Sequence, residues 1–311
     1  MAQFPARHDG GGGSIMEQGK DGAGTGGGQT RGEYRLGEGF GGETVHADLE
    51  GQRSYHDFLE LDKILDAQPT ITGEHDEPLF FILHQVKELW MKLMLHELEA
   101  AFPHIRNDDL RPAFKIFARV KRIQENLIQA WHILTTMTPA DYLKFRDGLG
   151  RSSGFQSFQY RSIEFVFGNK QRATMAPFEH RPDIVRRLTE LLERPSLYDE
   201  IVMLLARRGY VIDDAVLDRD WSRKREPNDS VVAAWQDVYR TSGEQWGLYE
   251  LAEHLIDIDD LFQTWRFRHR NAVERVIGHK IGTGGTSGVG YLTRATAIRL
   301  FPELWAVRTG L

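Results

Sequence analysis

Apolar residues along most of the chain recur every three or four positions, which is the spacing of an amphipathic helix. The clearest stretch runs from 110 to 137 and has apolar residues at Phe114, Phe117, Val120, Ile123, Leu127, Trp131 and Leu134. A polar, acidic segment at 72–77 is typical of a helix N-terminus, and a periodic stretch follows it to Phe102. Further helices are predicted near residues 139–148, 156–168, 182–193, 196–208, 230–240 and 251–277.

Strand signals are scarce, because few segments alternate apolar and polar residues between hairpin turns. The pattern therefore predicts an all-α fold, with residues 51–311 as a single helical-bundle domain. Residues 1–50 differ, since they hold 15 of the 31 glycines and none of the seven tryptophans. Such a segment cannot bury enough apolar surface to offset the entropy of ordering it. We expect it to be a mostly disordered, Gly-rich tail.

The amino-acid composition excludes several classes of protein and several kinds of functional site. The absence of cysteine excludes disulfides, thiolate nucleophiles and cysteine-held metal centres. The formal net charge of −6 gives no basic footprint for nucleic acid. No apolar run approaches the length of a membrane span, and the N-terminus lacks a signal-peptide pattern. We therefore expect a cytoplasmic protein that binds neither nucleic acid nor membrane.

Two histidines lie on apolar helical stripes. His269 continues the stripe formed by Leu255, Ile258, Phe262 and Trp265, so it is predicted to face the core. His84 shares a helix face with Phe80 and Met91, although Glu88 interrupts that stripe. A buried imidazole can be a hydrogen-bonded core residue, and it can also hold haem iron between the helices of a bundle. The spacing alone does not decide between these interpretations.

Three further motifs carry candidate chemistry. The loop GTGGTSGVG at 282–290 can close over a polar ligand or be a simple turn, and it lacks the context of a P-loop or a dinucleotide fingerprint. Residues 150–154 match the G-x-S-x-G pattern around Ser152, but a serine hydrolase needs a strand before that serine. Tyr142 and Arg146, four residues apart, can grip a carboxylate together or form a solvated helix face.

Several blocks, taken together, resemble the tryptophan 2,3-dioxygenase family. They are SYHDFLELDKILDAQ (54–68), LFFILHQVKELWMKLMLHELEAA (79–101), DYLKFRDGLGRSSGFQSFQYRSIEF (141–165), RFRHRNAVERVIGHKIGTGGTSGVGYL (266–292) and FPELWAVRT (301–309). The resemblance implies a haem-dependent dioxygenase that adds O₂ across the indole C2–C3 bond of L-tryptophan. The product is N-formyl-L-kynurenine, and the reaction is the first step of tryptophan catabolism by the kynurenine pathway.

The resemblance also implies roles for individual residues. His269 matches the axial ligand of haem b, which is expected once per subunit, and His84 matches the catalytic histidine that meets the indole N–H. The other implied haem-binding residues are Trp131, Ser153 and Gly154. The other implied substrate-binding residues are Phe80, Phe81, Ile82, Leu83, Tyr142, Arg146 and Thr283. Tyr55 matches a tyrosine that reaches a neighbouring subunit's pocket, so a homotetramer is expected.

Two positions depart from the family pattern. Phe58 stands where a second tyrosine is often found, and Leu83 replaces a glutamine that often precedes the catalytic histidine. Two other haem functions stay open, namely an oxygenase that inserts one oxygen atom into another aromatic compound and a non-catalytic gas-binding protein. Tyr142, Arg146 and Thr283 favour an amino acid substrate, because a substrate without an amino acid head group needs none of them.

Overall fold

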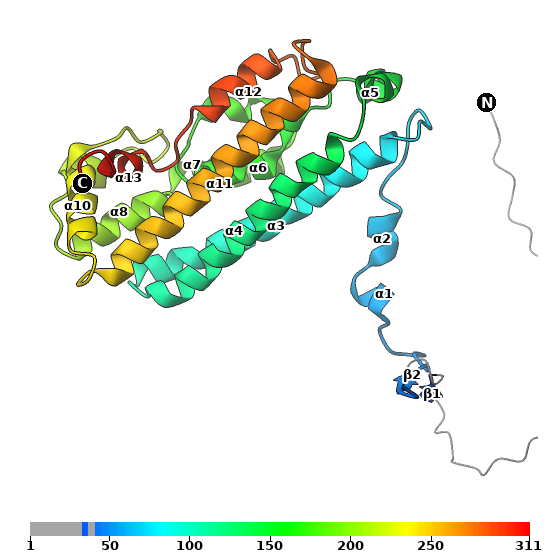
Figure 1. Cartoon of the computed structure of the whole chain (residues 1–311), viewed down its shortest axis with the longest axis horizontal. Coiled ribbons are helices and arrows are strands. Elements are labelled where there is room, and N and C mark those ends of the chain that lie inside the picture. Colours follow the sequence, from blue (N-terminus) through cyan, green and yellow to red (C-terminus); the bar gives the residue numbers. More distant parts are fainter. Residues whose placement is uncertain (1–32, 37–40) are drawn as a thin grey trace, which may run out of the picture. The chain divides into compact units, whose positions relative to one another are not determined.

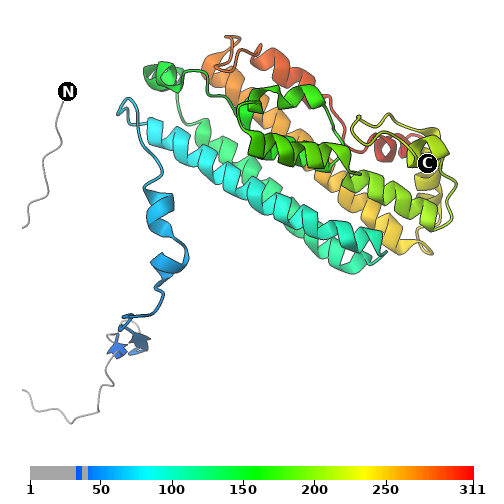
Figure 2. The same ribbon diagram turned by 180° about the vertical axis from the view of Figure 1, so that it is seen from behind.

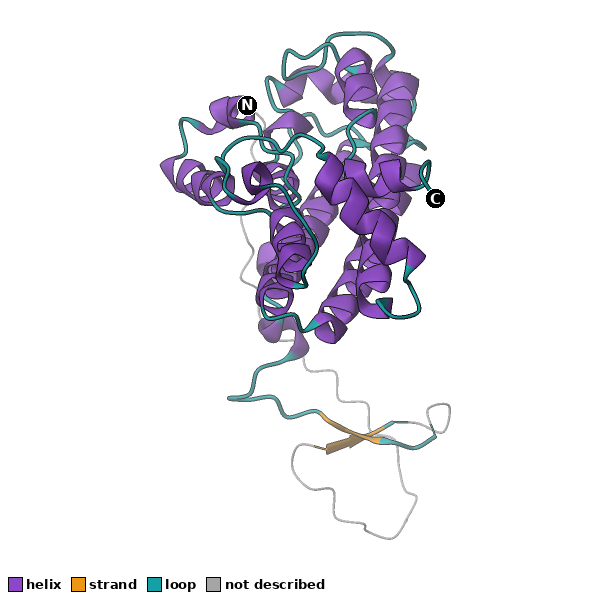
Figure 3. Cartoon of the chain, turned by 90° about the vertical axis from the view of Figure 1, so that its left-hand side faces the viewer, coloured by secondary structure: helices purple, strands orange, loops and turns teal. Residues whose placement is uncertain are grey.

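The computed structural model describes residues 33–36 and 41–311. By its packing the chain divides into two units, residues 1–67 and residues 68–311, and each is described by itself. This boundary lies later than the boundary near residue 50 that the composition predicts. Figure 3 colours the elements by secondary structure.

The described part of the first unit contains a short hairpin and two short helices. Strand β1 (Glu33–Arg35) pairs antiparallel with β2 (Thr44–His46), with Tyr34 opposite Val45. Helix α1 (Tyr55–Phe58) begins at a capping box formed by Ser54 and Asp57, and α2 (Leu61–Leu65) follows. The sequence analysis predicted no strand, because three-residue strands are too short to show an alternating pattern. The rest of the predicted tail, residues 1–32 and 37–40, lies outside the described residues.

Three long helices form the frame of the second unit: α3 (Glu77–Arg106), α4 (Leu110–Leu134) and α11 (Trp246–Ile277). Helices α3 and α4 lie side by side, and α11 packs along α4 (Figures 1 and 2). The remaining helices are α5 (Pro139–Phe145), α6 (Phe158–Val166), α7 (Pro182–Glu193), α8 (Leu197–Arg207), α9 (Asp214–Leu217), α10 (Asp229–Arg240), α12 (Val289–Thr296) and α13 (Pro302–Val307). The described helices confirm the predicted all-α class.

The predicted stripe of α4 is its buried face. Phe117 and Val120 are fully buried, and Leu127, Trp131 and Leu134 are nearly so. One polar residue lies on the same face: Gln124 Nε2 donates to the Ile258 carbonyl of α11 at 3.0 Å, whereas Gln124 Oε1 has no partner within the described chain. Apolar packing and this hydrogen bond together fix α11 against α4.

The boundaries of three helices differ from the predictions. The helix predicted at 139–148 divides into α5 and a 3-10 helix at Arg146–Leu149. Helix α11 begins five residues before the predicted start, and α3 extends past Phe102 to Arg106 although Pro103 lies inside it. None of the helices in the described part of the chain combines the length and the apolar character that a bilayer span requires.

Two buried carboxylates hold the C-terminal segment on the helices. Asp259 of α11 accepts hydrogen bonds from the Leu300 amide at 3.1 Å and from Trp305 Nε1 at 2.8 Å. Glu303 of α13 is fully buried and lies 2.6 Å from Arg225 Nη1. Because both partners of the Glu303 pair are withdrawn from water, each depends on the other to offset its lost hydration.

We predict that Glu303→Ala lowers the free energy of unfolding by about 3–5 kcal/mol, since it leaves the Arg225 guanidinium buried without its partner. Urea denaturation measures the loss. Glu125→Ala, which breaks the exposed Arg122–Glu125 pair, is the control and should leave the unfolding midpoint unchanged. Equal losses in the two variants would contradict the interpretation.

Candidate active site

A cavity of about 230 Å³ lies between α3, α4, α6, α11 and α12. It is lined by Phe80, His84, Lys87, Glu88, Met91, Trp131, Leu134, Met137, Tyr142, Ser153, Gly154, Phe155, Ser157, Tyr160, Arg161, Trp265, Arg266, His269, Ala272, Val273, Val276, Ile277, Gly282, Thr283, Thr286, Gly288, Tyr291, Leu292 and Ala295. Helix packing therefore brings to one space residues that lie more than 200 positions apart in the sequence.

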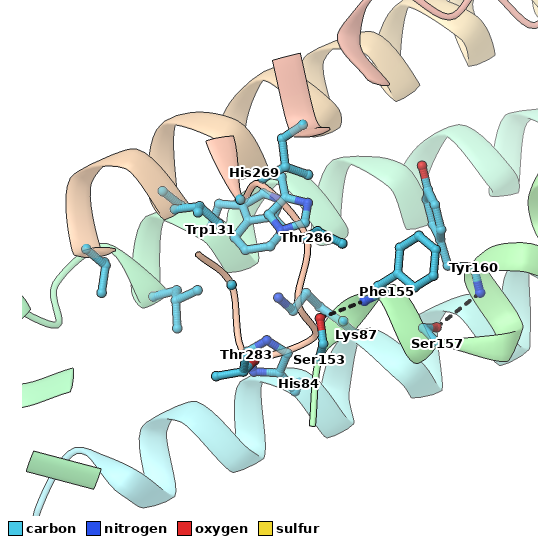
Figure 4. Close-up of a pocket in the computed structure, with 18 of the residues that line it drawn as sticks. His84, Lys87, Trp131, Ser153, Phe155, Ser157, Tyr160, His269, Thr283 and Thr286 are labelled. Atoms are coloured by element: carbon cyan, nitrogen blue, oxygen red, sulfur yellow. Dashed lines mark hydrogen bonds between the residues drawn. The ribbon is translucent and has the colours of Figure 1, made fainter. Parts of the chain in front are cut away.

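His84 enters the cavity from α3 in a defined orientation (Figure 4). Its Nδ1 lies 2.7 Å from the Phe80 carbonyl oxygen one turn earlier, so Nδ1–H donates there and Nε2 is left as an acceptor. Burial, together with the charge of Lys87, lowers the pKa of His84 to about 3. The imidazole is therefore neutral near pH 7 and can accept a hydrogen bond from an N–H group.

His269 enters the cavity from α11 against an indole surface. Its ring stacks on Trp131 at a centroid distance of 4.4 Å and an interplanar angle of 12°, and Trp265 lies at 5.4 Å. Burial and the nearby positive charge of Lys87 lower the pKa of His269 to about 3. A neutral imidazole held in this way has the lone pair that a metal ion needs.

Helix α5 supplies the aromatic side of the cavity near Phe80. The Phe80 ring lies 4.2 Å from the His84 ring and 6.1 Å from the ring of Tyr142. Burial raises the pKa of Tyr142, so its hydroxyl stays protonated and can donate a hydrogen bond. These rings together form an aromatic wall of the cavity, which a flat aromatic ligand can contact.

The glycine-rich loop forms one wall with the turn at 152–154. Thr283 Oγ1 donates to the Ser152 carbonyl at 2.5 Å. A Cβ on Gly284 would lie 2.6 Å from Ser153 Cβ, so only glycine allows the loop to approach this closely. A 3-10 helix, not a strand, precedes Ser152, so the structure lacks the nucleophile elbow that a serine hydrolase requires.

Arg146 lies next to this wall, in the 3-10 helix that follows α5. Its Nη2 donates to the Ile281 carbonyl at 2.8 Å, which leaves other N–H groups of the guanidinium available. The loop before α3 packs on the same 3-10 helix, because a Cβ on Gly148 would lie 3.3 Å from a methyl group of Thr72. Glu77 holds that loop by accepting hydrogen bonds from the amides at residues 71–73.

Eight of the predicted site residues line the cavity: Phe80, His84, Trp131, Tyr142, Ser153, Gly154, Thr283 and His269. Phe81, Ile82 and Leu83 are not among the lining residues, because successive helical residues point in different directions. Ile82 is 48 % exposed, and Leu83 packs in an apolar cluster. Arg146 is not among the lining residues either, and Tyr55 belongs to the first unit, where it is 77 % exposed.

Several lining residues were not predicted as site residues from the sequence. Trp265 lies one turn before His269 and Lys87 one turn after His84, so helical spacing from the two histidines indicates both. Arg161 lies within the block 141–165 that carries the family resemblance. Its ion pair with Glu164, at 2.5 Å, could be identified only from the structure.

The cavity walls also contain buried donors without acceptors. Trp131 Nε1, Trp265 Nε1 and Arg161 Nε have no hydrogen-bond partner within the described chain. Such donors are costly unless a ligand supplies acceptors. Two neutral imidazoles, flat aromatic walls and unpartnered donors fit a macrocycle that carries both a metal ion and carboxylates.

The fold and the site define a helical-bundle protein in which two neutral imidazoles face one cavity between the helices. A family model described as tryptophan 2,3-dioxygenase matches residues 41–238 and 236–311. The chain belongs to this family.

Bacterial relatives match most of the chain. It is 54 % identical over 269 residues to a tryptophan 2,3-dioxygenase of Bradyrhizobium sp. (strain BTAi1 / ATCC BAA-1182), which covers 86 % of this chain and 96 % of the relative. It is 53 % identical to the enzyme of that name from Ralstonia pickettii (strain 12J), over 88 % of this chain and 99 % of the relative. The corresponding protein of Geobacillus thermodenitrificans (strain NG80-2) is 52 % identical, over 86 % and 95 %.

The lowered pKa of His84 predicts an acid-sensitive fold. Between pH 6.5 and 3 the unfolded chain binds a proton that the folded state excludes, so stability falls as the pH falls. Above pH 6.5 this group has no further effect. The slope is about 1.4 kcal/mol per pH unit for each such group.

His84→Gln removes one of these groups, so the variant should lose less stability between pH 6.5 and 4.5 than the parent. Urea unfolding of the ligand-free chain at several pH values measures the two slopes. Parallel slopes would show that His84 is not buried as a neutral group.

Proposed function

We propose that this cavity is the active site of a haem-dependent tryptophan 2,3-dioxygenase. Both atoms of O₂ are added across the indole C2–C3 bond of L-tryptophan, which gives N-formyl-L-kynurenine. The observation that carries the assignment is the pair of neutral histidines, His84 and His269, which face one cavity from different helices. The family is haem-dependent, in agreement with the flat, donor-lined space between these histidines.

Haem b, one per subunit, would be held by His269, with Trp131 beside the ligand and Ser153 and Gly154 along the edge of the macrocycle. When bound, the ferrous iron supplies the activation of O₂ that the side chains of the protein cannot provide. The stack of His269 on Trp131 fixes the orientation of the imidazole before any ligand enters. The protein's own contribution is placement of the indole and exclusion of water.

His84 orients the indole ring. Because Nδ1–H already donates to the Phe80 carbonyl, Nε2 is free to accept a hydrogen bond from the indole N–H. Phe80 and Tyr142 then contact the ring, which presents its C2–C3 edge toward the centre of the cavity. The low pKa of His84 keeps it an acceptor throughout the physiological range.

Arg146 and Thr283 select the amino acid head group. The guanidinium retains free N–H donors for the substrate carboxylate, and the Thr283 oxygen retains lone pairs for the ammonium group. A carboxylate that enters a dry pocket loses its hydration, so this pairing decides whether L-tryptophan or a neutral indole is preferred.

A homotetramer is part of the proposal, and exposed apolar surface supports it. Ile82, Val86, Leu89 and Leu93 lie on one outward face of α3 and are 36–50 % exposed. Tyr55 is 77 % and Phe58 70 % exposed in the first unit. Large apolar side chains exposed in this number are typical of subunit interfaces. Phe58 offers no hydroxyl there, so Tyr55 alone would supply one from this helix to a neighbouring subunit.

Arg146→Ala should lower kcat/KM for L-tryptophan by about a hundredfold to several thousandfold, the kinetic equivalent of losing a buried charge partner. Turnover of 3-methylindole, which has no carboxylate, should change far less. Lys144→Ala, at an exposed position of α5 two residues before Arg146, is the matched control. An equal loss for both substrates would refute a role for Arg146 in selectivity.

His269→Ala should abolish tight haem binding or change the Soret band grossly, because it removes the axial imidazole. The measurements are haem content per subunit and the absorption spectra of the ferric and ferrous protein. Arg268→Ala, the exposed neighbour, and His84→Ala should both retain the haem. A normal Soret spectrum in His269→Ala would assign the iron ligand to another residue.

A further inference from the structure

Three basic side chains line the cavity, and within the described chain one of them, Lys87, forms no ion pair. Arg161 and Arg266 share Glu164, at 2.5 Å and 3.8 Å. Lys87 of α3 is only 5 % exposed, yet within the described chain its side-chain nitrogen forms no ion pair and no hydrogen bond. The adjacent Glu88 carboxylate favours the charged form of Lys87 electrostatically, but its Oε2 accepts from Gln159 Nε2 at 2.8 Å. The partner of Lys87 is instead the Trp131 ring, whose centroid lies 3.7 Å from Nζ. Burial disfavours the charged form of Lys87 and lowers its pKa to about 7, so an anion bound beside the side-chain nitrogen would stabilise the ammonium form.

The position of Lys87 along α3 indicates which anion it can meet. With a rise of 1.5 Å per residue, Lys87 lies about 4.5 Å beyond His84, on the side away from Phe80. Tyr142 lies on the Phe80 side, together with the predicted site for the substrate carboxylate. The Lys87 side chain instead reaches between His84 and Trp131 (Figure 4). The substrate carboxylate and Lys87 are therefore on opposite sides of His84.

The wall next to Lys87 offers a second donor. Trp131 is 3 % exposed, and its Nε1–H has no acceptor within the described chain. A carboxylate has two oxygens and can accept from an ammonium and from an indole N–H at once. By contrast, Arg161 already forms an ion pair with Glu164.

We propose that Lys87 binds a carboxylate of the macrocyclic cofactor and so contributes to recognition of haem by its charged edge. This inference rests on the proposed function. Lys87, one helical turn after His84, is thus a cofactor-binding residue. Its ammonium occupies the face of Trp131 in the ligand-free chain and exchanges this contact for the anion on binding.

The test compares two probes in the full chain freed of haem: ferric protoporphyrin IX and its dimethyl ester, which lacks both negative charges. The parent protein should prefer the free acid by at least about tenfold. Lys87→Met should lose most of that preference while its affinity for the ester remains. Lys87→Arg should retain it, and Lys92→Met, at an exposed position of α3, should match the parent.

The possible outcomes distinguish a failure of the proposed function from a failure of the role proposed for Lys87. If the parent protein binds neither probe, the proposed function fails. If the parent binds haem but Lys87→Met keeps the same ratio of affinities, only the role of Lys87 is overturned. Retained ester affinity and an unchanged helical circular dichroism spectrum show that the variant is folded, and Lys87→Gln serves as a second neutral variant if Lys87→Met does not fold.

Discussion

Burial of two imidazoles in one cavity is the constraint on which the rest of the site depends. His84 and His269 are both held neutral, with pKa values of about 3, because the helices that carry them exclude water. A protonated His84 could not accept from an indole N–H, and a protonated His269 could not bind a metal ion. Each imidazole also has a fixed orientation, set by the Phe80 carbonyl in one case and by the Trp131 ring in the other.

The long helices α3, α4 and α11 fix the positions of the two cavity walls that carry His84 and His269. Helix α4 packs between α3 and α11, and Gln124 fixes α11 to it through a buried hydrogen bond. At the far end, Asp259 and Glu303 tie the C-terminal segment to this frame. Near the mouth, Gly284 allows the glycine-rich loop to lie directly against Ser153, which a larger residue would prevent. The site is therefore built on rigid helices and closed by a loop whose composition is set by close contact.

The polar side chains of the cavity are only partly satisfied by the protein. Arg161 and Arg266 share Glu164, whereas Lys87 and two indole N–H groups have no acceptor within the described chain. Native proteins rarely leave buried donors in this state, because each costs free energy. The incomplete pairing leaves these donors available to a ligand that carries hydrogen-bond acceptors.

The sequence by itself determined the helical class, the buried faces of α4 and α11, and the family to which the chain is related. These follow from local periodicity and from distinctive blocks such as the glycine loop, which a single chain displays without folding. Only the tertiary structure decided that Phe80 and His84 face the cavity while Ile82 between them faces outward and Leu83 enters an apolar cluster. It also decided that Arg161 forms an ion pair with Glu164, whereas Lys87 forms none within the described chain. Ion pairs depend on which helices pack together. The helical periodicity of one segment does not show which other segments will pack against it.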